Sequence, residues 1–287
     1  MNYKSVFTPG LFKGQVVIVT GGGSGIGRCT AHELAALGAT VALVGRKLEK
    51  LTAVVGEVEA AGGRASAHAC DIREEDTVNA TVAAVLAAHG RIDGLVNNAG
   101  GQYPSPLAGI KAKGWETVLR SNLTGGFLMA RECYTQWMEA HGGAIVNIIA
   151  DMWMGMPGMG HSGAARAGML NLTETAALEW APVRSNAVAP GWIASSGMDH
   201  YPPEMGPLIR KMATMVPARR LGSESEVSAA IVFLLSPAAA FISGACLRVD
   251  GAAPNARRHW PEVGNGKSTE AFNGFHLAAT PKVLQGN

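Results

Sequence analysis

Aromatic residues are scarce in this chain of 287 residues, at 6%, and only four of them are tyrosines. Four residues after each tyrosine stands an apolar residue: Phe7, Leu107, Met138 and Met205. A lysine one helical turn from a tyrosine lowers the pKa of the phenol and makes it a ready proton donor. The sequence therefore excludes a proton-transfer site built from a tyrosine and a lysine on one turn of a helix.

Charge is also sparse. Charged residues make up 16% of the chain and the formal net charge is +2, which is too small to favour a nucleic-acid partner. Hydrophobic residues reach 47%, so we expect a globular protein with a large core.

Cysteines are few and far apart, at positions 29, 70, 133 and 246. They show neither metal-ligand spacing nor a disulfide framework, so we expect no metal and four buried thiols in a reducing compartment. No apolar run is long enough to cross a bilayer, and residues 1–6 carry no signal core. We therefore expect a cytoplasmic protein with no membrane partner.

Short β-branched runs alternate with longer helical patterns along the chain. The predicted strands cover residues 15–20, 40–44, 64–70, 92–96, 144–149, 185–188 and 246–249, and the predicted helices cover 25–37, 47–61, 74–89, 115–140, 164–180 and 224–235. Strict alternation predicts right-handed crossovers and one doubly wound α/β sheet. We expect one domain over residues 1–251, with a substrate-loop insertion at about 194–222, and an irregular C-terminal extension over 252–287.

A glycine-rich turn links the first predicted strand to the first predicted helix. Its residues are Thr20, Gly21, Gly22, Gly23, Ser24, Gly25, Ile26 and Gly27. Glycines let the backbone approach a pyrophosphate, and the helix N-terminus offers free N–H groups and a positive dipole end. The turn indicates a dinucleotide site, although glycines can also serve tight packing alone.

The end of the second predicted strand favours NADP(H) over NAD(H). The position that would carry an acid for the ribose 2′-hydroxyl is Gly45, and Arg46 and Lys47 follow it. A guanidinium can fork onto a 2′-phosphate, which an acid would repel. The alternative is that both cations form an ordinary solvated helix start.

Together with this turn, further motifs resemble the ordered landmarks of the classical short-chain dehydrogenase/reductase family over about residues 12–251. These motifs are Asp71-Ile72, Asn97-Asn98-Ala99-Gly100, Asn122 and Pro190-Gly191. The resemblance implies a single Rossmann-type domain with a seven-stranded parallel sheet. It also implies a homodimer or homotetramer, in which the helix over 164–180 packs against its copy.

The resemblance assigns a cofactor role to most of these residues. It places Asp71 and Ile72 at the adenine, Asn98, Ala99 and Gly100 at the ribose, and Ile193 and Ser195, after Pro190 and Gly191, at the nicotinamide carboxamide. Asn122 would lie in a helix whose distortion supports a proton-relay water. The alternatives are a helix-start carboxylate for Asp71, a turn former for Asn98 and a helix-surface amide for Asn122.

The usual members of the family use Ser, Tyr and Lys, and this chain departs from all of them. The serine position falls at Ile149 or Ala150, the tyrosine position at Ser162 and the lysine position at Arg166. Arg166 remains a cation that can hold ribose hydroxyls, but it does not exchange protons as a lysine does. Ser162 is shorter than tyrosine and a far poorer acid.

The altered centre resembles that of the peroxisomal trans-2-enoyl-CoA reductases. The matching segments are 161–168, 143–149, 122–125 and 234–239. This resemblance implies that NADPH reduces a carbon–carbon double bond conjugated to a thioester, within fatty acid metabolism. Hydride goes to Cβ and the charge gathers on the thioester oxygen, so hydrogen bonds to that oxygen matter more than one strong acid.

Several side chains are candidates for this chemistry. Ser162 can donate to the thioester oxygen, and Asp151 can act as an acid if an apolar pocket keeps it protonated, or it can simply cap a strand end. Tyr103 can reach the site from its loop, although an aromatic that only closes the site is the simpler interpretation. For His161 we expect a packing role.

Two methionine-rich segments suit a flexible acyl chain, or serve as adaptable core filler. They contain Met152, Met154, Met156 and Met159, and Met198, Met205, Met212 and Met215. Four cations in the insertion can face the phosphates of coenzyme A or simply be solvated: Arg210, Lys211, Arg219 and Arg220. Prolines and glycine over 202–207 indicate a mobile lid.

Two other functions remain open. One is an alcohol or aldehyde dehydrogenase for a branched, terpenol-like alcohol of the citronellol type, which the methionines suit and the missing tyrosine opposes. The other is a catalytically silent NADP(H)-binding protein, which the replaced serine and tyrosine positions favour.

Overall fold

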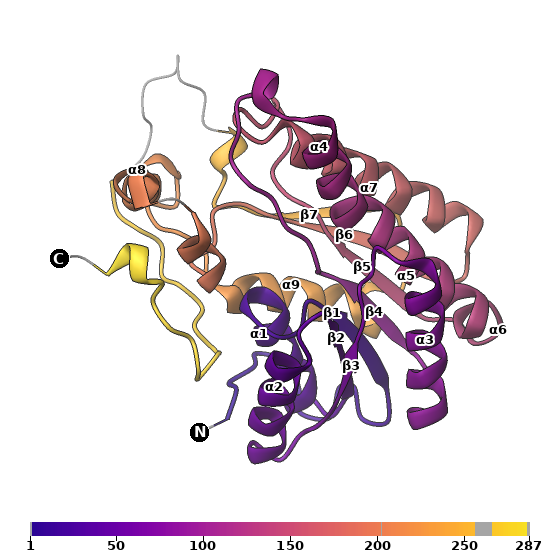
Figure 1. The fold of residues 1–287 in the computed structure, drawn as a ribbon. Helices are drawn as coiled ribbons and strands as arrows, with labels where there is room; N and C mark the ends of the chain where they lie inside the picture. Colours follow the sequence, from indigo (N-terminus) through magenta and orange to yellow (C-terminus); the bar gives the residue numbers. More distant parts are fainter. Residues whose placement is uncertain (1, 202, 256–265, 286–287) are drawn as a thin grey trace.

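Seven parallel strands form one sheet, in the order β3-β2-β1-β4-β5-β6-β7. The computed structural model describes residues 2–201, 203–255 and 266–285 (Figure 1). The strands are β1 (Val16–Thr20), β2 (Thr40–Gly45), β3 (Arg64–Ala69), β4 (Gly94–Asn97), β5 (Ala144–Ile148), β6 (Arg184–Pro190) and β7 (Cys246–Val249). The predicted single Rossmann-type domain is confirmed, and the winding direction of the chain reverses between β1 and β4.

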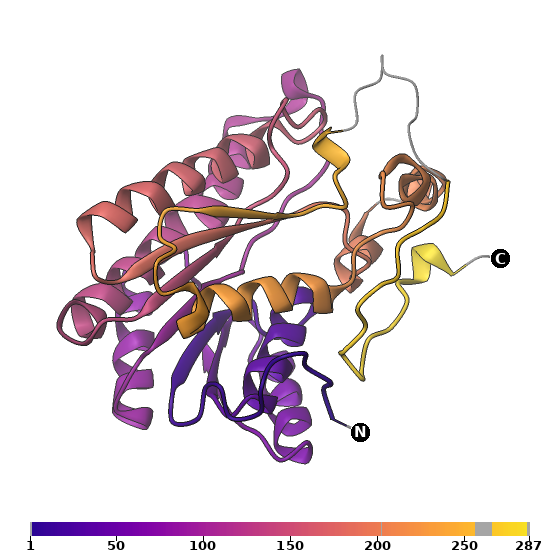
Figure 2. The ribbon, with the colours of Figure 1, turned by 180° about the vertical axis from the view of Figure 1, so that it is seen from behind.

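Helices cover both faces of the sheet, as the two opposite views show (Figures 1 and 2). The helices are α1 (Gly25–Ala36), α2 (Leu48–Ala60), α3 (Glu75–His89), α4 (Ala112–Leu119), α5 (Gly125–Cys133), α6 (Glu139–His141), α7 (Gly160–Glu179), α8 (Gly206–Met215) and α9 (Glu224–Leu235). Helices α1, α2 and α9 pack on one face, and α3 and α5 pack on the other.

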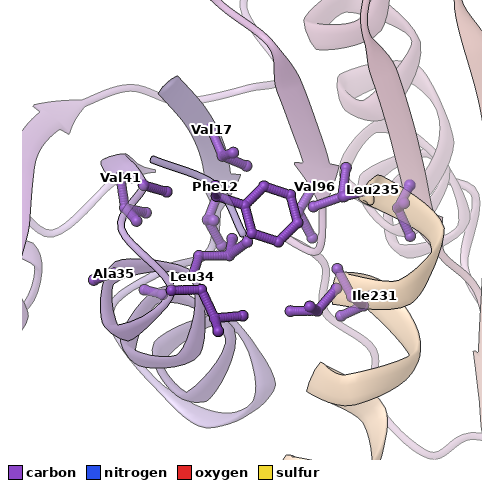
Figure 3. Packing of buried hydrophobic residues seen from close by; sticks show 14 of the residues in the cluster. Phe12, Val17, Leu34, Ala35, Val41, Val96, Ile231 and Leu235 are labelled. Atoms are coloured by element: carbon purple, nitrogen blue, oxygen red, sulfur yellow. The ribbon is translucent and has the colours of Figure 1, made fainter. Parts of the chain in front are cut away.

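Alternation along the strands divides the core into two layers. Val17 and Val19 of β1 join Leu34 of α1 and Ile231 of α9 in one cluster, which Figure 3 shows around Phe12. Val16 and Ile18, the alternate residues of β1, contribute to the cluster on the opposite face. Because successive side chains of a strand point to opposite faces, an apolar residue at every position predicts a strand buried on both sides.

Helix α7 begins at Gly160, four residues before the predicted start, and this prediction was wrong. The two glycines at 160 and 163 are poor helix formers, so the sequence placed the start at the alanines that follow. In the structure His161 and Ser162 are fully buried, and the Ser162 N–H donates to Nδ1 of His161 at 2.9 Å. Packing of this first turn therefore overrides its weak propensity.

Two other expectations need correction. The long predicted helix over 115–140 is a run from α4 to α6 that contains π-helical turns at Arg120–Thr124 and Tyr134–Met138. Cys246 is only partly buried, unlike the other three cysteines. The reason is its place on β7, which is an edge strand with a neighbour on one side.

The described part of the C-terminal extension binds to the body of the domain. Phe275 is buried and its N–H donates to Oγ of Ser225 at 3.1 Å, while Gly274 accepts from the Lys4 N–H at 2.8 Å. Farther on, the Val283 carbonyl accepts from Arg210 of α8. The extension thus ties α8 to the start of α9. None of the helices in the described ranges combines the length and apolar composition needed to cross a bilayer.

Leu34→Ala tests the layered core. Leu34 is fully buried, so its truncation should lower the free energy of unfolding by about 2–5 kcal/mol, measured by urea titration with circular dichroism. The matched control is Leu48→Ala, because Leu48 is a helical leucine that is 48% exposed, and it should change stability by about 0.5 kcal/mol or less. Equal losses in both variants would contradict this core.

Candidate active site

The glycine-rich turn presents open backbone donors at the end of β1. Gly21 and Gly25 have φ angles of +65° and +56°, and a Cβ on Gly21 would lie 3.0 Å from Cα of Ala99. Helix α1 begins at Gly25, and the side chain of Ser24 makes no capping hydrogen bond. The first N–H groups of α1 therefore remain available to an anion.

The hydroxyl of Thr20 ties this turn to the end of β4. It donates to the Val96 carbonyl at 3.2 Å and accepts from the N–H groups of Asn98 and Ala99, each at 2.9 Å. The side-chain amide of Asn98 donates back to the Thr20 carbonyl at 2.9 Å. The side chains of Thr20 and Asn98 thus join the ends of β1 and β4. A direct contact with the cofactor stays a prediction for Thr20, Gly21, Ser24, Gly25, Ile26, Gly27, Asn98, Ala99 and Gly100.

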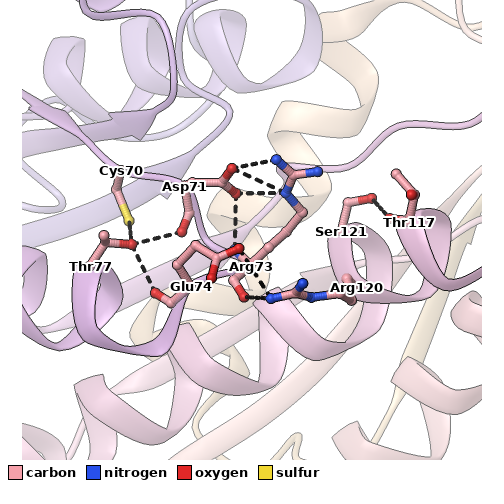
Figure 4. Close-up of polar contacts among 8 residues, drawn as sticks. All are labelled: Cys70, Asp71, Arg73, Glu74, Thr77, Thr117, Arg120 and Ser121. Carbon is pink, nitrogen blue, oxygen red and sulfur yellow. Dashed lines mark hydrogen bonds and ion pairs between the residues drawn. The ribbon is translucent and has the colours of Figure 1, made fainter. Parts of the chain in front are cut away.

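Arg46 is exposed where β2 ends, beside the carboxylate of Asp71. Asp71 forms a two-pronged pair with Arg73, with Nε–Oδ1 at 2.8 Å and Nη2–Oδ2 at 2.5 Å (Figure 4). These hydrogen bonds, helped by the charge of Arg46, lower the pKa of Asp71 to about 2. The adjacent Ile72 is buried and packs against the backbone of Gly125, so its side chain belongs to the core.

Farther along the carboxyl edge of the sheet, the backbone after β6 is fixed on two sides. The Gly191 N–H donates to the Val249 carbonyl at 2.9 Å, and a Cβ on Gly191 would lie 2.9 Å from Cα of Asp250. Ile193 is buried and bridges to Gly222, and Ser195 follows it, partly buried. Pro190, Gly191, Ile193 and Ser195 thus lie on one fixed strand end, as their predicted role at the nicotinamide requires.

Asn122 and Arg166 meet at Gly100. A Cβ on Gly100 would collide with Oδ1 of Asn122 and with Nη2 of Arg166, so any larger residue would displace these two side chains. Asn122, in the first π-helical turn, is 2% exposed, donates to the Gly101 carbonyl at 2.6 Å and accepts from the Gly101 N–H at 3.1 Å. Its side chain thus fixes the loop after β4, and its predicted support of a relay water stays a prediction.

Arg166 carries its charge without a carboxylate partner among the interactions of the described residues. Its Nη1 donates to the Ile148 carbonyl at 2.5 Å, and its Nε is buried with no hydrogen-bond partner. Burial lowers the pKa of Arg166 to about 10, so it stays a cation at neutral pH. A buried orphan donor on a cation suits the hydroxyl groups of a ribose.

A carboxamide occupies the position beside Ser162. Oγ of Ser162 donates to Oε1 of Gln102 at 2.5 Å, and Nε2 of Gln102 donates to the Tyr201 hydroxyl at 3.2 Å. Gln102 and Tyr201 did not emerge from the sequence, because they lie 99 residues apart with no motif around either. The phenol of Tyr201 is thus separated from Ser162 by an amide.

His161 and Tyr103 pack beside this chain of contacts. Their rings meet edge to face with centroids 4.7 Å apart, and His161 is fully buried. Nδ1 of His161 accepts a backbone hydrogen bond, and its Nε2 has no partner among the described residues. This geometry agrees with the packing role expected for His161 and with a Tyr103 that closes the site.

Asp151 follows β5 and is partly buried. Its Oδ1 is buried without a hydrogen-bond partner among the described residues. Burial, and next the charge of Asp250, raise the pKa of Asp151, while Arg248 opposes them. Arg248 is itself paired with Asp250 at 2.8 Å and lies over the ring of Trp153. A carboxyl group that holds its proton more tightly than usual is a candidate acid.

The insertion after β6 folds over its own small cluster. Met198, Ile209 and Met212 are buried in it, and Tyr201, Met205, Leu221, Val283 and Leu284 pack around them. Met154 of the first methionine-rich segment and Met215 of the second are 96% and 57% exposed, so neither segment buries all of its methionines. Arg220 is paired with Glu226 at 2.6 Å, which makes it a poor candidate for a coenzyme A phosphate.

One surface pocket adjoins these residues, and another lies at the opposite edge of the sheet. A pocket of about 400 Å³ is lined by Trp192, Val216 and Asp250 at the carboxyl ends of β6 and β7. The larger one, of about 480 Å³, is lined by the first residues of β1, β2 and β3. It lies at the amino ends of the strands, opposite the edge where open α/β sheets bind ligands.

Comparison with known proteins supports an oxidoreductase. The family model for enoyl-(acyl carrier protein) reductases matches residues 21–252. Among curated proteins, the probable 2,4-dienoyl-CoA reductase of Bacillus subtilis (strain 168) is 34% identical over 242 residues, which cover 83% of this chain and 95% of that protein.

Solved structures with this fold include proteins that are named for other substrates. A citronellol catabolism dehydrogenase (AtuB) of Pseudomonas aeruginosa PAO1 is 63% identical with a TM-score of 0.80, covering 88% of this chain and 99% of that one. A putative NAD(P)-dependent gluconate 5-dehydrogenase from Beutenbergia cavernae, with bound NADP at low occupancy, is 31% identical with a TM-score of 0.81, covering 87% and 100%. These proteins share a fold and differ in substrate.

Two charge-removing variants test the environment of Asp151. Asp250→Asn removes a negative neighbour of the ionised form and should lower the pKa of Asp151, whereas Arg248→Gln removes a positive neighbour and should raise it. The measurement is a carboxyl carbon NMR titration of Asp151. Shifts of the same sign in both variants would show that Asp151 does not sense this pair.

Proposed function

Because the chain belongs to the short-chain dehydrogenase/reductase family, we propose that it reduces the conjugated double bond of a 2-enoyl-CoA thioester with NADPH. The observation that carries this proposal is the Ser162 hydroxyl, which is hydrogen-bonded to the amide of Gln102 where a lysine-supported phenol would be needed for carbonyl chemistry. The family's oxidoreductase activity and nicotinamide cofactor are the premise.

Reduction of an aldehyde or ketone requires a proton at oxygen as the charge develops. Neither neighbour of the substrate position suits that task, because Ser162 is a very weak acid and Arg166 keeps its proton at neutral pH. Reduction of an enoyl thioester places the charge on the thioester oxygen and the proton finally on Cα. That chemistry needs hydrogen-bond donors at the oxygen and an acid near Cα.

Asp151 is our candidate for the acid, because burial and Asp250 raise its pKa and so favour its protonated form. It follows β5, and Ser162 follows on the next helix, so both belong to the carboxyl edge of the sheet. Ser162 would orient the substrate oxygen only indirectly, since its own proton is given to Gln102.

The crevice fits a phosphorylated dinucleotide. The free N–H groups at the start of α1 suit the pyrophosphate, the orphan Nε of Arg166 suits the nicotinamide ribose, and the exposed Arg46 suits a 2′-phosphate. When bound, the reduced nicotinamide supplies the hydride. NADP(H) is our proposal over NAD(H) because Gly45 leaves no acid at the end of β2.

A citronellol-type dehydrogenase is the second candidate, and one observation favours it. AtuB, named for citronellol catabolism, is 63% identical over 88% of this chain. The cluster of Met198, Ile209 and Met212 suits a branched alcohol as well as an acyl chain. A silent NADP(H)-binding protein, a cytoplasmic location and a homodimer or homotetramer also remain predictions.

Arg46→Ala tests the cofactor choice. Loss of a charge-assisted contact should raise the dissociation constant for NADPH about tenfold or more and leave that for NADH unchanged, as measured by fluorescence titration. The matched control is Arg64→Ala, an exposed arginine at the amino end of β3, which should change neither constant. Equal effects of Arg46→Ala on both nucleotides would remove the 2′-phosphate from this site.

Two substrate panels test the reaction. Absorbance of the reduced nicotinamide should fall when the protein and NADPH meet crotonyl-CoA or decenoyl-CoA, and should change little when the protein and NADP⁺ meet citronellol or geraniol. Turnover only in the second panel would overturn the proposal in favour of the dehydrogenase. Tight NADPH binding without turnover in either panel would leave the silent binding protein.

A further inference from the structure

The side chain of Gln102 is held at both ends of its carboxamide. Oε1 accepts from Ser162 on α7 at 2.5 Å, and Nε2 donates to the Tyr201 hydroxyl at 3.2 Å. We propose that Gln102 is the hydrogen-bond donor to the carbonyl oxygen of the substrate, and that Ser162 and Tyr201 aim it. The identity of that oxygen as a thioester oxygen rests on the proposed function.

The hydrogen-bond inventory leaves one donor of Gln102 available. A primary amide carries two N–H groups, and among the described residues Nε2 donates only to Tyr201. The Ser162 hydroxyl has a single proton, which is directed to Gln102, so it cannot also be given to a substrate. The second N–H of Gln102 is therefore the donor that this group of residues can offer.

The backbone just before Gln102 is held in place by neighbouring side chains. The residue before it, Gly101, exchanges two hydrogen bonds with the buried amide of Asn122, at 2.6 Å and 3.1 Å. Gly100 is confined between Asn122 and Arg166. In space, the loop after β4 thus connects the turn after β1 with the first turn of α7, and the hydrogen bonds to Ser162 and Tyr201 limit the freedom of the exposed Gln102 side chain before it binds a ligand.

Tyr201 comes from the insertion after β6, which reaches Gln102 through this hydrogen bond. Its ring packs against the cluster of Met198, Ile209 and Met212, and Val283 of the C-terminal extension packs there too. The hydroxyl of Tyr201 accepts one N–H of Gln102, which directs the other away from it. The position of Tyr201 and the aim of the amide are therefore coupled, which makes Tyr201 a positioning residue.

An amide suits enolate chemistry better than carbonyl reduction. When hydride adds to Cβ, the π electrons of the double bond move towards the thioester and the carbonyl oxygen gains negative charge. The Gln102 N–H shortens its hydrogen bond to that oxygen but keeps its proton, and the enolate then takes a proton at Cα from a separate acid. A contact that strengthens as charge develops lowers the barrier more than it tightens substrate binding.

Gln102→Met tests this donor with a side chain of similar length and no N–H group. In the NADPH assay with crotonyl-CoA, kcat should fall about 10²–10³-fold while KM and the dissociation constant for NADPH change little. Tyr201→Phe should give a smaller fall in kcat. The matched controls are Gln136→Met and Tyr134→Phe, which lie on the run between α5 and α6 and should keep full activity.

The outcomes separate this inference from the proposed function. A Gln102→Met enzyme with wild-type circular dichroism and unchanged kcat would overturn the inference even if enoyl-CoA reduction is correct. If the wild type turns over only citronellol or citronellal, the same variants are compared on those substrates. A fall in kcat there supports the donor, and no fall overturns it.

If neither panel gives turnover, the contact between Gln102 and a thioester is tested by NMR. Butyryl-CoA, a saturated thioester, is added to the protein loaded with NADP⁺, and the side-chain amide signals of Gln102 are followed, assigned by their loss in Gln102→Met. A downfield shift of one N–H proton, absent with coenzyme A alone, supports the contact. Unchanged signals at concentrations that saturate binding would overturn it.

Discussion

The rest of the site depends on the hydroxyl of Thr20, whose hydrogen bonds hold the ends of β1 and β4 together. It is fully buried, donates to the Val96 carbonyl and accepts from the backbone N–H groups of Asn98 and Ala99. These bonds join the ends of β1 and β4, where the winding of the sheet reverses and the two chain segments diverge. In open α/β sheets, ligands bind at such a reversal point.

A second buried network places α7. Asn97 of β4 donates to Asn147 of β5 at 2.9 Å, and Asn147 donates to Thr173 of α7 at 2.9 Å. With α7 fixed to the sheet in this way, Ser162 and Arg166 face the loop after β4. We propose that the amide of Gln102, the cation of Arg166 and the separate carboxyl group of Asp151 form one site, and such a set favours charge stabilisation at a substrate oxygen over proton delivery to it.

Much of the fold was predictable because its strands are buried on both faces. The segments Val16–Val19 and Val41–Val44 contain no polar residue. Such short apolar runs are typical of parallel strands that are buried on both faces. The cofactor turn was predictable for a similar reason, since glycines between a strand and a helix allow close approach to phosphate. Positive φ angles at Gly21 and Gly25 agree with that interpretation.

The start of α7 and the contacts of Ser162 were beyond the sequence. The glycines at 160 and 163 have low helix propensity, so the sequence did not predict the first turn of α7. That turn is stabilised by the burial of His161. The Gln102–Tyr201 contact joins two loops whose separation is set by the tertiary fold, and no local pattern encodes it. Motifs therefore predicted residues for a cofactor, whereas the tertiary fold determines the contacts among Ser162, Gln102 and Tyr201.

Our central claim is that the site stabilises negative charge on the substrate oxygen and does not deliver a proton to it. Transfer of deuterium is the most direct test of this claim. The protein is supplied with NADPH deuterated at C4 and with crotonyl-CoA and citronellal together, in ordinary water. The account predicts deuterium at Cβ of butyryl-CoA, hydrogen from water at Cα, and unchanged citronellal. Deuterium at C1 of citronellol, with crotonyl-CoA left intact, would contradict it.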